Sequence, residues 1–195
     1  MPGKVFAHII LARIKPTLSH RRPQQSGFTY GRSMCDRIAT LCNIAQWRQD
    51  FGHPTFAAFV DLCAPFDSLS RPALWLLLTR LGIVRLFRVL YDNSVSCVRT
   101  GGTHNSWFKI EAGVRQGCVL APDSFATGTD WLLGRTVESC SVGVAFGQSS
   151  FTDLDFADDV SLLAELLEFL VPILDTIASE AASLGLEVNW QKTKV

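Results

Sequence analysis

The chain of 195 residues is 48% hydrophobic, and its 18 basic side chains balance 18 acidic ones. This length fits one domain or part of a larger one, and the apolar fraction is high enough for a buried core. No apolar run approaches the ~18 residues of a membrane-spanning helix, so we expect no membrane partner, and the zero net charge gives no general indication of nucleic-acid binding.

Hydrophobic periodicity predicts helices and one central strand in the first half of the chain. Ser33 and Ser70 are suitable N-caps, and Gly82 is a suitable helix end. The residues on both faces of the central strand are apolar, which is typical of a strand covered on both faces. In chain order the predicted elements are a helix at residues 4–18, a loop at 20–30, a helix at 33–49, the strand at 55–61, helices at 70–82 and 84–91, and a hairpin at 95–110.

The second half of the chain predicts two more helices and three more strands, so we expect an α+β fold. Trp107 and Phe108 of the preceding hairpin are expected to pack on the face of a sheet. Pro172 lies inside the apolar pattern of the last helix, which indicates either that the helix begins later or that the chain is damaged there. The predicted elements are a loop at residues 113–117, a helix at 122–137, strands at 142–146 and 151–156, a helix at 163–184, and a strand at 186–189.

Positive charge is concentrated at the start of the chain. Residues 1–48 hold eight lysines and arginines against one acid, whereas residues 49–195 hold 10 basic and 17 acidic residues. This segregation favours a phosphate-binding edge beside a metal-binding body, although segregation by chance is the alternative. Arg21, Arg22 and Arg32 are the candidates for contact with phosphate, while a solvated charged face is the simpler interpretation of any single arginine.

The six cysteines show no CxxC spacing, which argues against a zinc site or a disulfide framework. We expect reduced and mostly buried thiols in an intracellular protein of the nucleus or cytoplasm. The apolar start of the chain is short and is interrupted by His8, so it predicts an amphipathic helix and not a signal peptide.

Two adjacent carboxylates, Asp158 and Asp159, follow Phe156-Ala157 at the tip of a predicted hairpin. Asp61 ends the predicted central strand, where an unneutralised carboxylate is costly. Oxygen ligands of this kind suit Mg²⁺, which also leaves positions open for phosphate. A solvated Asp-Asp turn is the alternative for this sequence taken alone.

Five sequence blocks that occur in a fixed order favour the metal site over the solvated turn. Together they resemble the palm of a reverse transcriptase, specifically that of non-LTR (LINE-type) retrotransposons, over nearly the whole chain. The blocks are Gln24-Gln25-Ser26-Gly27-Phe28 with Gly31-Arg32-Ser33, then Ala57-Ala58-Phe59-Val60-Asp61, Gly113-Val114-Arg115-Gln116-Gly117-Cys118, Phe156-Ala157-Asp158-Asp159, and Gly185-Leu186-Glu187-Val188-Asn189 with Lys192.

The resemblance implies a polymerase palm, an antiparallel sheet with helices packed on one face, at residues 55–195. Residues 1–54 would be a partial helical fingers region, and a thumb would lie outside the chain. The implied roles are as follows: catalysis by Asp61, Asp158 and Asp159; metal binding by these three and Leu62; nucleotide binding by Phe66, Gln116, Gly117 and Lys192; and nucleic-acid binding by Arg32 and Arg115.

The resemblance also implies the chemistry and the partners. Two Mg²⁺ ions, for which Mn²⁺ is a possible substitute, would serve nucleotidyl transfer from dNTPs to a primer 3′-hydroxyl. The partners would be an RNA template and a DNA primer; the sequence does not indicate an oligomeric state.

Four departures from the family pattern support a rival hypothesis, a catalytically inactive remnant that acts at most as a nucleic-acid-binding or interaction module. Asp155 stands where the family has an apolar residue, so it would either disturb the metal site or point to solvent. The others are Ala64-Pro65, Ser124-Phe125-Ala126 and Pro172.

Overall fold

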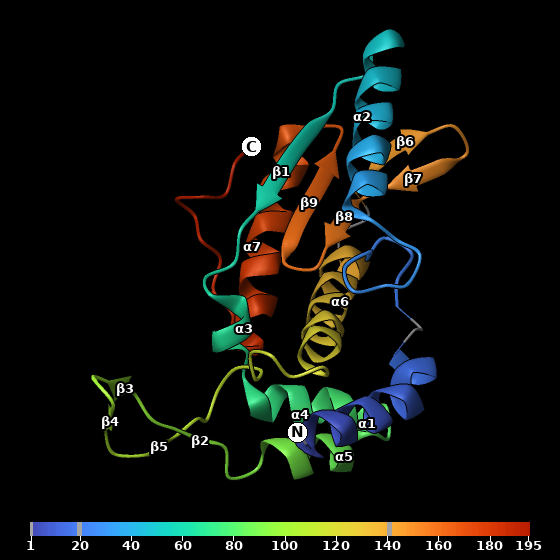
Figure 1. Cartoon of the computed structure of the whole chain (residues 1–195). Coiled ribbons are helices and arrows are strands. Elements are labelled where there is room, and N and C mark those ends of the chain that lie inside the picture. Colours follow the sequence, from blue (N-terminus) through green and yellow to red (C-terminus); the bar gives the residue numbers. More distant parts are fainter. Residues whose placement is uncertain (1, 19–20, 140–141) are drawn as a thin grey trace.

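A three-stranded antiparallel sheet lies at the centre of the computed structural model, which describes residues 2–18, 21–139 and 142–195. Its strands are β1 (Phe56–Val60), β9 (Asp159–Ala164) and β8 (Asp153–Phe156), in the order β1-β9-β8. β9 is the middle strand, and it pairs with β1 from Phe56↔Ala164 to Val60↔Val160 (Figure 1). The predicted α+β class is confirmed.

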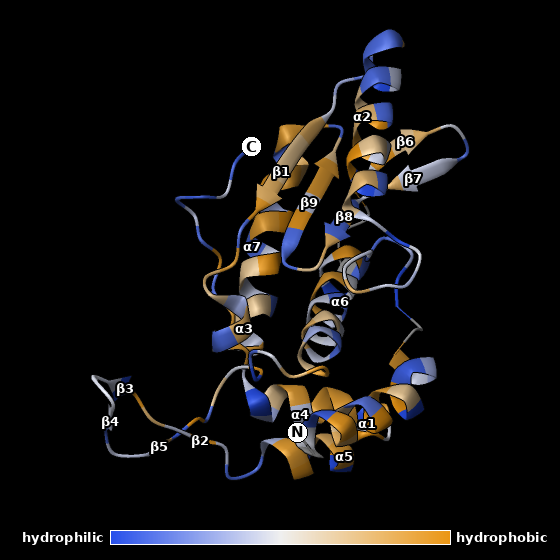
Figure 2. Cartoon of the chain, in the orientation of Figure 1, coloured by the Kyte–Doolittle hydropathy of each residue, from blue (hydrophilic) through white to orange (hydrophobic). Residues whose placement is uncertain are grey.

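Two long helices, α6 (Ala121–Ser139) and α7 (Leu167–Ser183), cover one face of this sheet. The main core lies between them and the strands, and Figure 2 shows the hydrophobic colouring on β1, β9 and α7. Because neighbouring residues of a strand point to opposite faces, Leu162 enters this core while Leu163 enters a second one. The second cluster is small and packs against α2 (Met34–Asp50).

The prediction that the central strand is covered on both faces is therefore only partly right. The α2 side of the sheet is covered near one end, and Phe59 in β1 is 47% exposed. This face is left open beside the turn that joins β8 to β9.

A helical layer of α1, α4 and α5 lies below the sheet in the view of Figure 1. Ile10 and Ile14 of α1 join the main core, as do Leu78 and Phe87 of the other two helices. Pro16 falls in the last turn of α1. The bounds are α1 Pro2–Leu18, α4 Arg71–Arg80 and α5 Val84–Tyr91, which agree closely with the predicted helices.

Two predicted elements in the second half of the chain have different bounds in the structure. The segment at 151–156 divides into β7 (Ser149–Phe151), which pairs with β6 (Val144–Phe146), and β8. The last helix begins at Leu167, because Leu163 belongs to β9; Pro172 nevertheless lies inside α7. A short apolar run fits a strand and a helix equally well, which is why periodicity alone misplaced this boundary.

The predicted strand at residues 186–189 is not formed as a strand. The segment makes one isolated bridge, Leu62↔Val188, and the tail that follows makes another, Phe59↔Lys194. Both lie on β1 or just beyond its end, so the C-terminal residues fix the place where Asp61 emerges from the sheet.

The predicted hairpin in the middle of the chain is present as two short strand pairs. β2 (Val95–Ser96) pairs with β5 (Phe108–Lys109), and β3 (Arg99–Thr100) pairs with β4 (Thr103–His104). The expectation that Trp107 and Phe108 pack on a sheet face is wrong, because their side chains are 66% and 50% exposed. A ribbon of two strands has no second layer against which to bury them.

The five cysteines that the structure describes are free thiols, as predicted, but none of them is buried. Cys35 and Cys42 are exposed, Cys63, Cys97 and Cys118 are half-buried, and Cys140 lies outside the described residues. Within the described residues, no helix combines the length and the hydrophobicity needed to cross a membrane.

A buried ion cluster joins the start of the chain to β8. Arg22 lies 2.7 Å from Asp153 and 2.9 Å from Asp155, and its third acidic neighbour, Asp130 of α6, is 3.3 Å away. One guanidinium cannot neutralise three carboxylates. Burial, followed by the charge of Asp153, therefore raises the pKa of the fully buried Asp155 well above its ordinary range.

The cluster shows that Asp155 neither disturbs the proposed metal site nor points to solvent, the two alternatives left open by the sequence. Asp155 pairs across the sheet with Val160, whose side chain faces the main core, so Asp155 points to the α6 side of the sheet. It neither reaches solvent nor joins the open face on which Asp159 lies.

We expect Asp155→Asn to change the pH dependence of stability. The raised pKa means that the folded chain keeps a proton which the unfolded chain releases near pH ~4. This contribution to stability is complete below that pH and is lost as pH rises through the folded pKa, so the variant should gain stability relative to the native chain as pH rises. Urea unfolding from pH 4 to pH 8 measures the difference, with the exposed Asp175→Asn as control; parallel curves for all three proteins would contradict the assignment.

Candidate active site

The turn between β8 and β9 carries the adjacent acids. Phe156 and Asp159 are the last cross-strand pair, so Ala157 and Asp158 form a two-residue turn, with Ala157 at a φ of +60°. A positive φ is unfavourable for a residue with a side chain, and this turn is held in place by its surroundings.

The strand register brings Asp61 to the same place. Val60 pairs with Val160, so Asp61, one residue past the end of β1, comes opposite Asp159. Both side chains fall on the open face, because each follows or precedes a residue that points into the main core. The two acids are 98 positions apart in the sequence but adjacent in the fold.

The electrostatics agree with this placement. Partial burial raises the pKa of Asp159, and the negative charges of Asp158 and Asp61 raise it further. Lys192 Nζ lies 3.9 Å from Asp61 Oδ2, at the same end of the sheet. The structure thus brings together the three predicted catalytic acids and the predicted nucleotide-binding lysine.

The C-terminal segment holds Asp61 by its backbone. The N–H of Asn189 donates to the carbonyl of Asp61 at 2.8 Å, and the N–H of Asp61 lies 3.3 Å from Oγ1 of Thr193. Leu62, predicted as a metal ligand, is buried and bridges to Val188.

The donor set suits a hard divalent cation, since its members are carboxylate oxygens at an open face. Within residues 2–18, 21–139 and 142–195, however, no three His, Cys, Asp or Glu side chains are positioned to hold one ion. Three like charges repel one another, although Lys192 lies 3.9 Å from Asp61, and this repulsion opposes a closed arrangement of their side chains.

A strap of residues 24–27, predicted only as a loop, supports the turn. Gln25 Oε1 accepts hydrogen bonds from the N–H groups of Gly27 (2.7 Å) and Ala157 (3.1 Å). The backbone N–H of Ser26 donates to the carbonyl of Asp155 at 3.0 Å, so the strap lies along β8 as a partial fourth strand. The Gln-Ser-Gly sequence was the available signal, but its partner could not be read from the sequence.

Gly27 is required by the closeness of this contact. A Cβ at position 27 would lie 2.1 Å from the backbone nitrogen of Ala157, a distance that no relaxation of a side chain can relieve. The strap and the turn must separate if a larger residue is introduced.

We expect Gly27→Ala to destabilise the chain by about 1–3 kcal/mol, because it overpacks backbone against backbone. Gly3→Ala is the matched control, since nothing lies within 4 Å of a Cβ built there. Urea denaturation of both variants measures the difference, and an unfolding midpoint for Gly27→Ala equal to that of the control would show that the strap does not hold the turn.

Phe66 and Gln116 lie on two neighbouring segments, α3 and the loop that follows Gly113. Phe66 lies in the short helix α3 (Pro65–Ser68), and its ring stacks on Phe125 at 4.3 Å and meets Phe28 edge-on at 6.4 Å. Gln116 Nε2 donates to both carboxylate oxygens of the neighbouring Asp67, at 3.0 and 3.3 Å.

The backbone before Gln116 is fixed on α3. Gly113 packs so closely that a Cβ would lie 2.6 Å from the carbonyl oxygen of Asp67, and the Val114 N–H donates to the carbonyl of Phe66 at 2.8 Å. Gly117 follows, exposed and at a φ of +77°.

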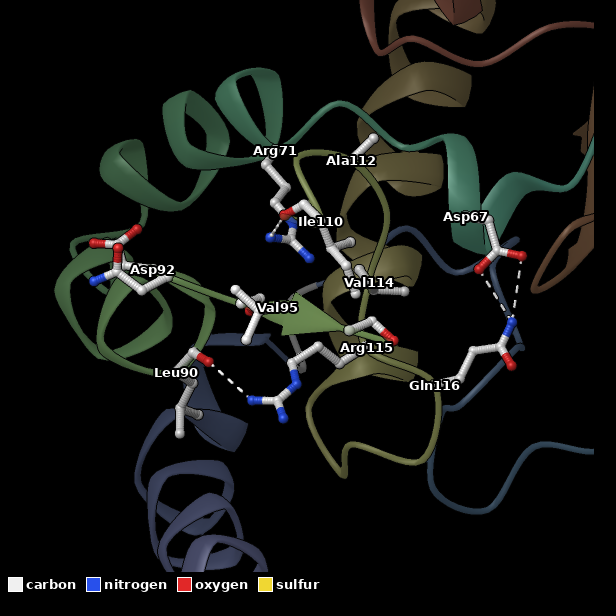
Figure 3. A pocket seen from close by; sticks show the side chains of 13 residues that line it. Asp67, Arg71, Leu90, Asp92, Val95, Ile110, Ala112, Val114, Arg115 and Gln116 are labelled. Atoms are coloured by element: carbon white, nitrogen blue, oxygen red, sulfur yellow. Dashed lines mark hydrogen bonds between the residues drawn. The ribbon is translucent and has the colours of Figure 1, made fainter. Parts of the chain in front are cut away.

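The predicted arginines have different surroundings. Arg115 is exposed, and its Nη1 donates to the carbonyl of Leu90 at 3.0 Å across a cavity of about 650 Å³ (Figure 3). Arg32 is exposed in the turn before α2, and within the described residues it contacts no other predicted site residue. Arg21 and Arg22 are not free for phosphate: Arg21 pairs with Asp123 at 2.7 Å, and Arg22 belongs to the buried cluster.

A comparison with known protein families identifies the family to which the chain belongs. The profile of the family described as reverse transcriptase (RNA-dependent DNA polymerase) matches residues 1–195. The chain is a member of the reverse transcriptase family.

Two retrotransposon polyproteins are similar in sequence, which confirms the predicted resemblance to non-LTR elements. The chain is 27% identical over 174 residues to the Pol polyprotein of the type-2 retrotransposable element R2DM of Drosophila melanogaster. It is 31% identical over 141 residues to that of the type-1 retrotransposable element R2 of Nasonia vitripennis. The matches cover 87% and 70% of this reverse transcriptase chain, but only 16% and 14% of the polyproteins.

Solved telomerase structures share the fold. The chain superposes on apo telomerase from Candida tropicalis with a TM-score of 0.69 at 14% identity, over 99% of its own length and 36% of that chain. A telomerase from Candida albicans in complex with a fragment of telomeric RNA gives a TM-score of 0.67 at 14% identity, over 98% and 33%. At these identities the likeness establishes the fold alone.

Proposed function

We propose that this chain carries the polymerase centre of a retrotransposon reverse transcriptase, which extends a DNA primer with dNTPs on an RNA template inside the cell. One observation carries the proposal: the β1–β9 register puts Asp61 opposite Asp159, with Asp158 beside them in the turn. The raised pKa of Asp159 supports it, because the acids share one electrostatic environment.

Two divalent ions, Mg²⁺ or in its place Mn²⁺, are the proposed cofactors, held by Asp61, Asp158 and Asp159 with Leu62 beside them. When bound, such ions activate an attacking hydroxyl and neutralise charge on the leaving group. The protein supplies the rest: the strap fixes the turn, and Asn189 and Thr193 fix the backbone of Asp61.

The nucleotide would lie between these acids and the Gln116 loop. Phe66, stacked on Phe125, offers a rigid edge for the sugar, and Gln116 with Gly117 offers polar and backbone groups. Lys192 would contact the triphosphate, and Arg115 and Arg32 the nucleic acid. In this proposal residues 1–54 act as partial fingers and residues 55–195 as the palm.

The rival hypothesis of an inactive remnant loses much of its support. Asp155 is paired with Arg22 on the core side of the sheet. Pro65 begins α3 after Ala64 turns the chain at a φ of +40°, and the buried Phe125 stacks on Phe66. These departures from the family pattern are accommodated by the fold and leave the acids in place.

We expect the chain to extend a DNA primer on an RNA template with Mg²⁺, and Asp159→Ala to lower the rate by roughly 10³-fold, because several kcal/mol of charge stabilisation is lost. Asp175→Ala, an exposed acid of α7, is the control that should retain the rate. Gel-resolved extension measures all three. Template binding without extension in every protein would favour the inactive remnant.

Metal binding can be measured without turnover. We expect Mg²⁺ to raise the melting temperature by a few degrees, roughly 2–4 °C for each kcal/mol of binding free energy, and Asp158→Asn to remove most of that gain. Asp175→Asn should keep it. Equal shifts in the native chain and Asp158→Asn would reject the proposed site.

A further inference from the structure

The ribbon, residues 95–109, projects from the body of the molecule near α5 (Figure 1). Every residue from 98 to 109 is exposed, although the two strand pairs give the ribbon a regular backbone. The prediction of a hairpin did not explain why a projection of this length carries two large aromatic residues.

The ribbon carries exposed aromatic side chains and basic side chains but no acid. Trp107 and Phe108 are both half-exposed or more, and Arg99 and Lys109 are the charged residues of the ribbon, which contains no acid. Exposed aromatic residues among cations form a stacking surface for bases together with contacts for phosphates. An apolar partner protein would not require the cations.

The foot of the ribbon is rigid. Arg71 is buried, its Nε donates to the carbonyl of Gly113 at 2.9 Å, and its Nη1 donates to the carbonyl of Ile110 at 2.5 Å. The guanidinium also lies over the ring of Tyr91 at 5.2 Å. The segment that leaves the ribbon is thereby tied to α4 before it enters the Gln116 loop.

A cavity of about 650 Å³ lies at the base of the ribbon and extends to Gln116 (Figure 3). Val95 and Arg115 lie side by side in its lining, and Gln116 lines it farther away, beside Asp67. The acids Asp67 and Asp92 also line it, and each has a partner: Asp67 accepts from Gln116, and Asp92 lies 3.9 Å from Arg88. A strand lying on the ribbon thus has a polar path to Gln116.

We propose that the ribbon binds single-stranded nucleic acid, with bases on Trp107 and Phe108 and phosphates at Arg99 and Lys109, and directs the strand through the cavity toward Gln116. This inference rests on the proposed polymerase function for its direction, but the binding itself is measured separately. Stacking of this kind is tolerant of sequence, so an unstructured RNA is a suitable probe.

The test is the affinity of the 195-residue chain for a fluorescent, unstructured single-stranded RNA, measured by anisotropy. We expect the double variant Trp107→Ala/Phe108→Ala to raise Kd by at least about tenfold. Phe51→Ala is the control, because Phe51 is 62% exposed and caps the end of α2, a helix that lies far from the ribbon in Figure 1. This variant should leave Kd unchanged.

A second variant tests the phosphate contacts. Arg99→Ala/Lys109→Ala should reduce the slope of log Kd against log salt by about 1.4, since each single-strand phosphate contact contributes about 0.7. All substituted side chains are exposed, so melting curves should remain those of the native chain.

The outcomes separate this proposal from the polymerase proposal. An unchanged Kd in both ribbon variants, or a loss of affinity for duplex RNA equal to that for single strands, would overturn the ribbon proposal. If the ribbon variants lose affinity while the native chain fails to extend a primer, the ribbon proposal stands and the polymerase proposal fails.

Discussion

The antiparallel pairing of β1 with β9 is the constraint on which the site depends. A shift of one residue in this register would move Asp61 away from Asp159 and would turn Val60 or Val160 out of the core. Burial of the valines therefore fixes the position of the carboxylates. Hydrophobic burial on the core face of the sheet therefore determines which carboxylates lie close together on its open face.

That end of the sheet would be unstable by itself. Ala157 takes a positive φ, and the acids beside it repel one another, so contacts from elsewhere must hold the turn. Gln25 binds the turn from one side, and the C-terminal segment binds the backbone of Asp61 from the other. Segments near the two ends of the chain thus hold the two sides of the acidic site, the turn and the end of β1.

The sequence predicted local features well and long-range contacts poorly. The helix starts at Ser33 and Ser70 could be predicted because a serine side chain caps backbone N–H groups only a few residues away. The structure has both N-caps. The boundary between β9 and α7 could not be predicted, because Leu163 satisfies both periodicities. The exposure of Trp107 could not be predicted either, since it depends on whether a second layer covers the hairpin.

Long-range contacts also change how the basic N-terminal region is interpreted. The sequence suggested a phosphate-binding edge, but Arg22 and Arg48 are turned inward, where Arg22 pairs with the buried Asp153 and Asp155 and Arg48 donates to the carbonyl of Pro54. The cations left exposed there include Lys4, Arg13 and Arg32. A count of charges along a sequence therefore overestimates the surface potential whenever a fold buries carboxylates, as this one does around Arg22. The proposed nucleic-acid contacts in the ribbon and at Arg115 therefore add to the cations that remain exposed at the start of the chain.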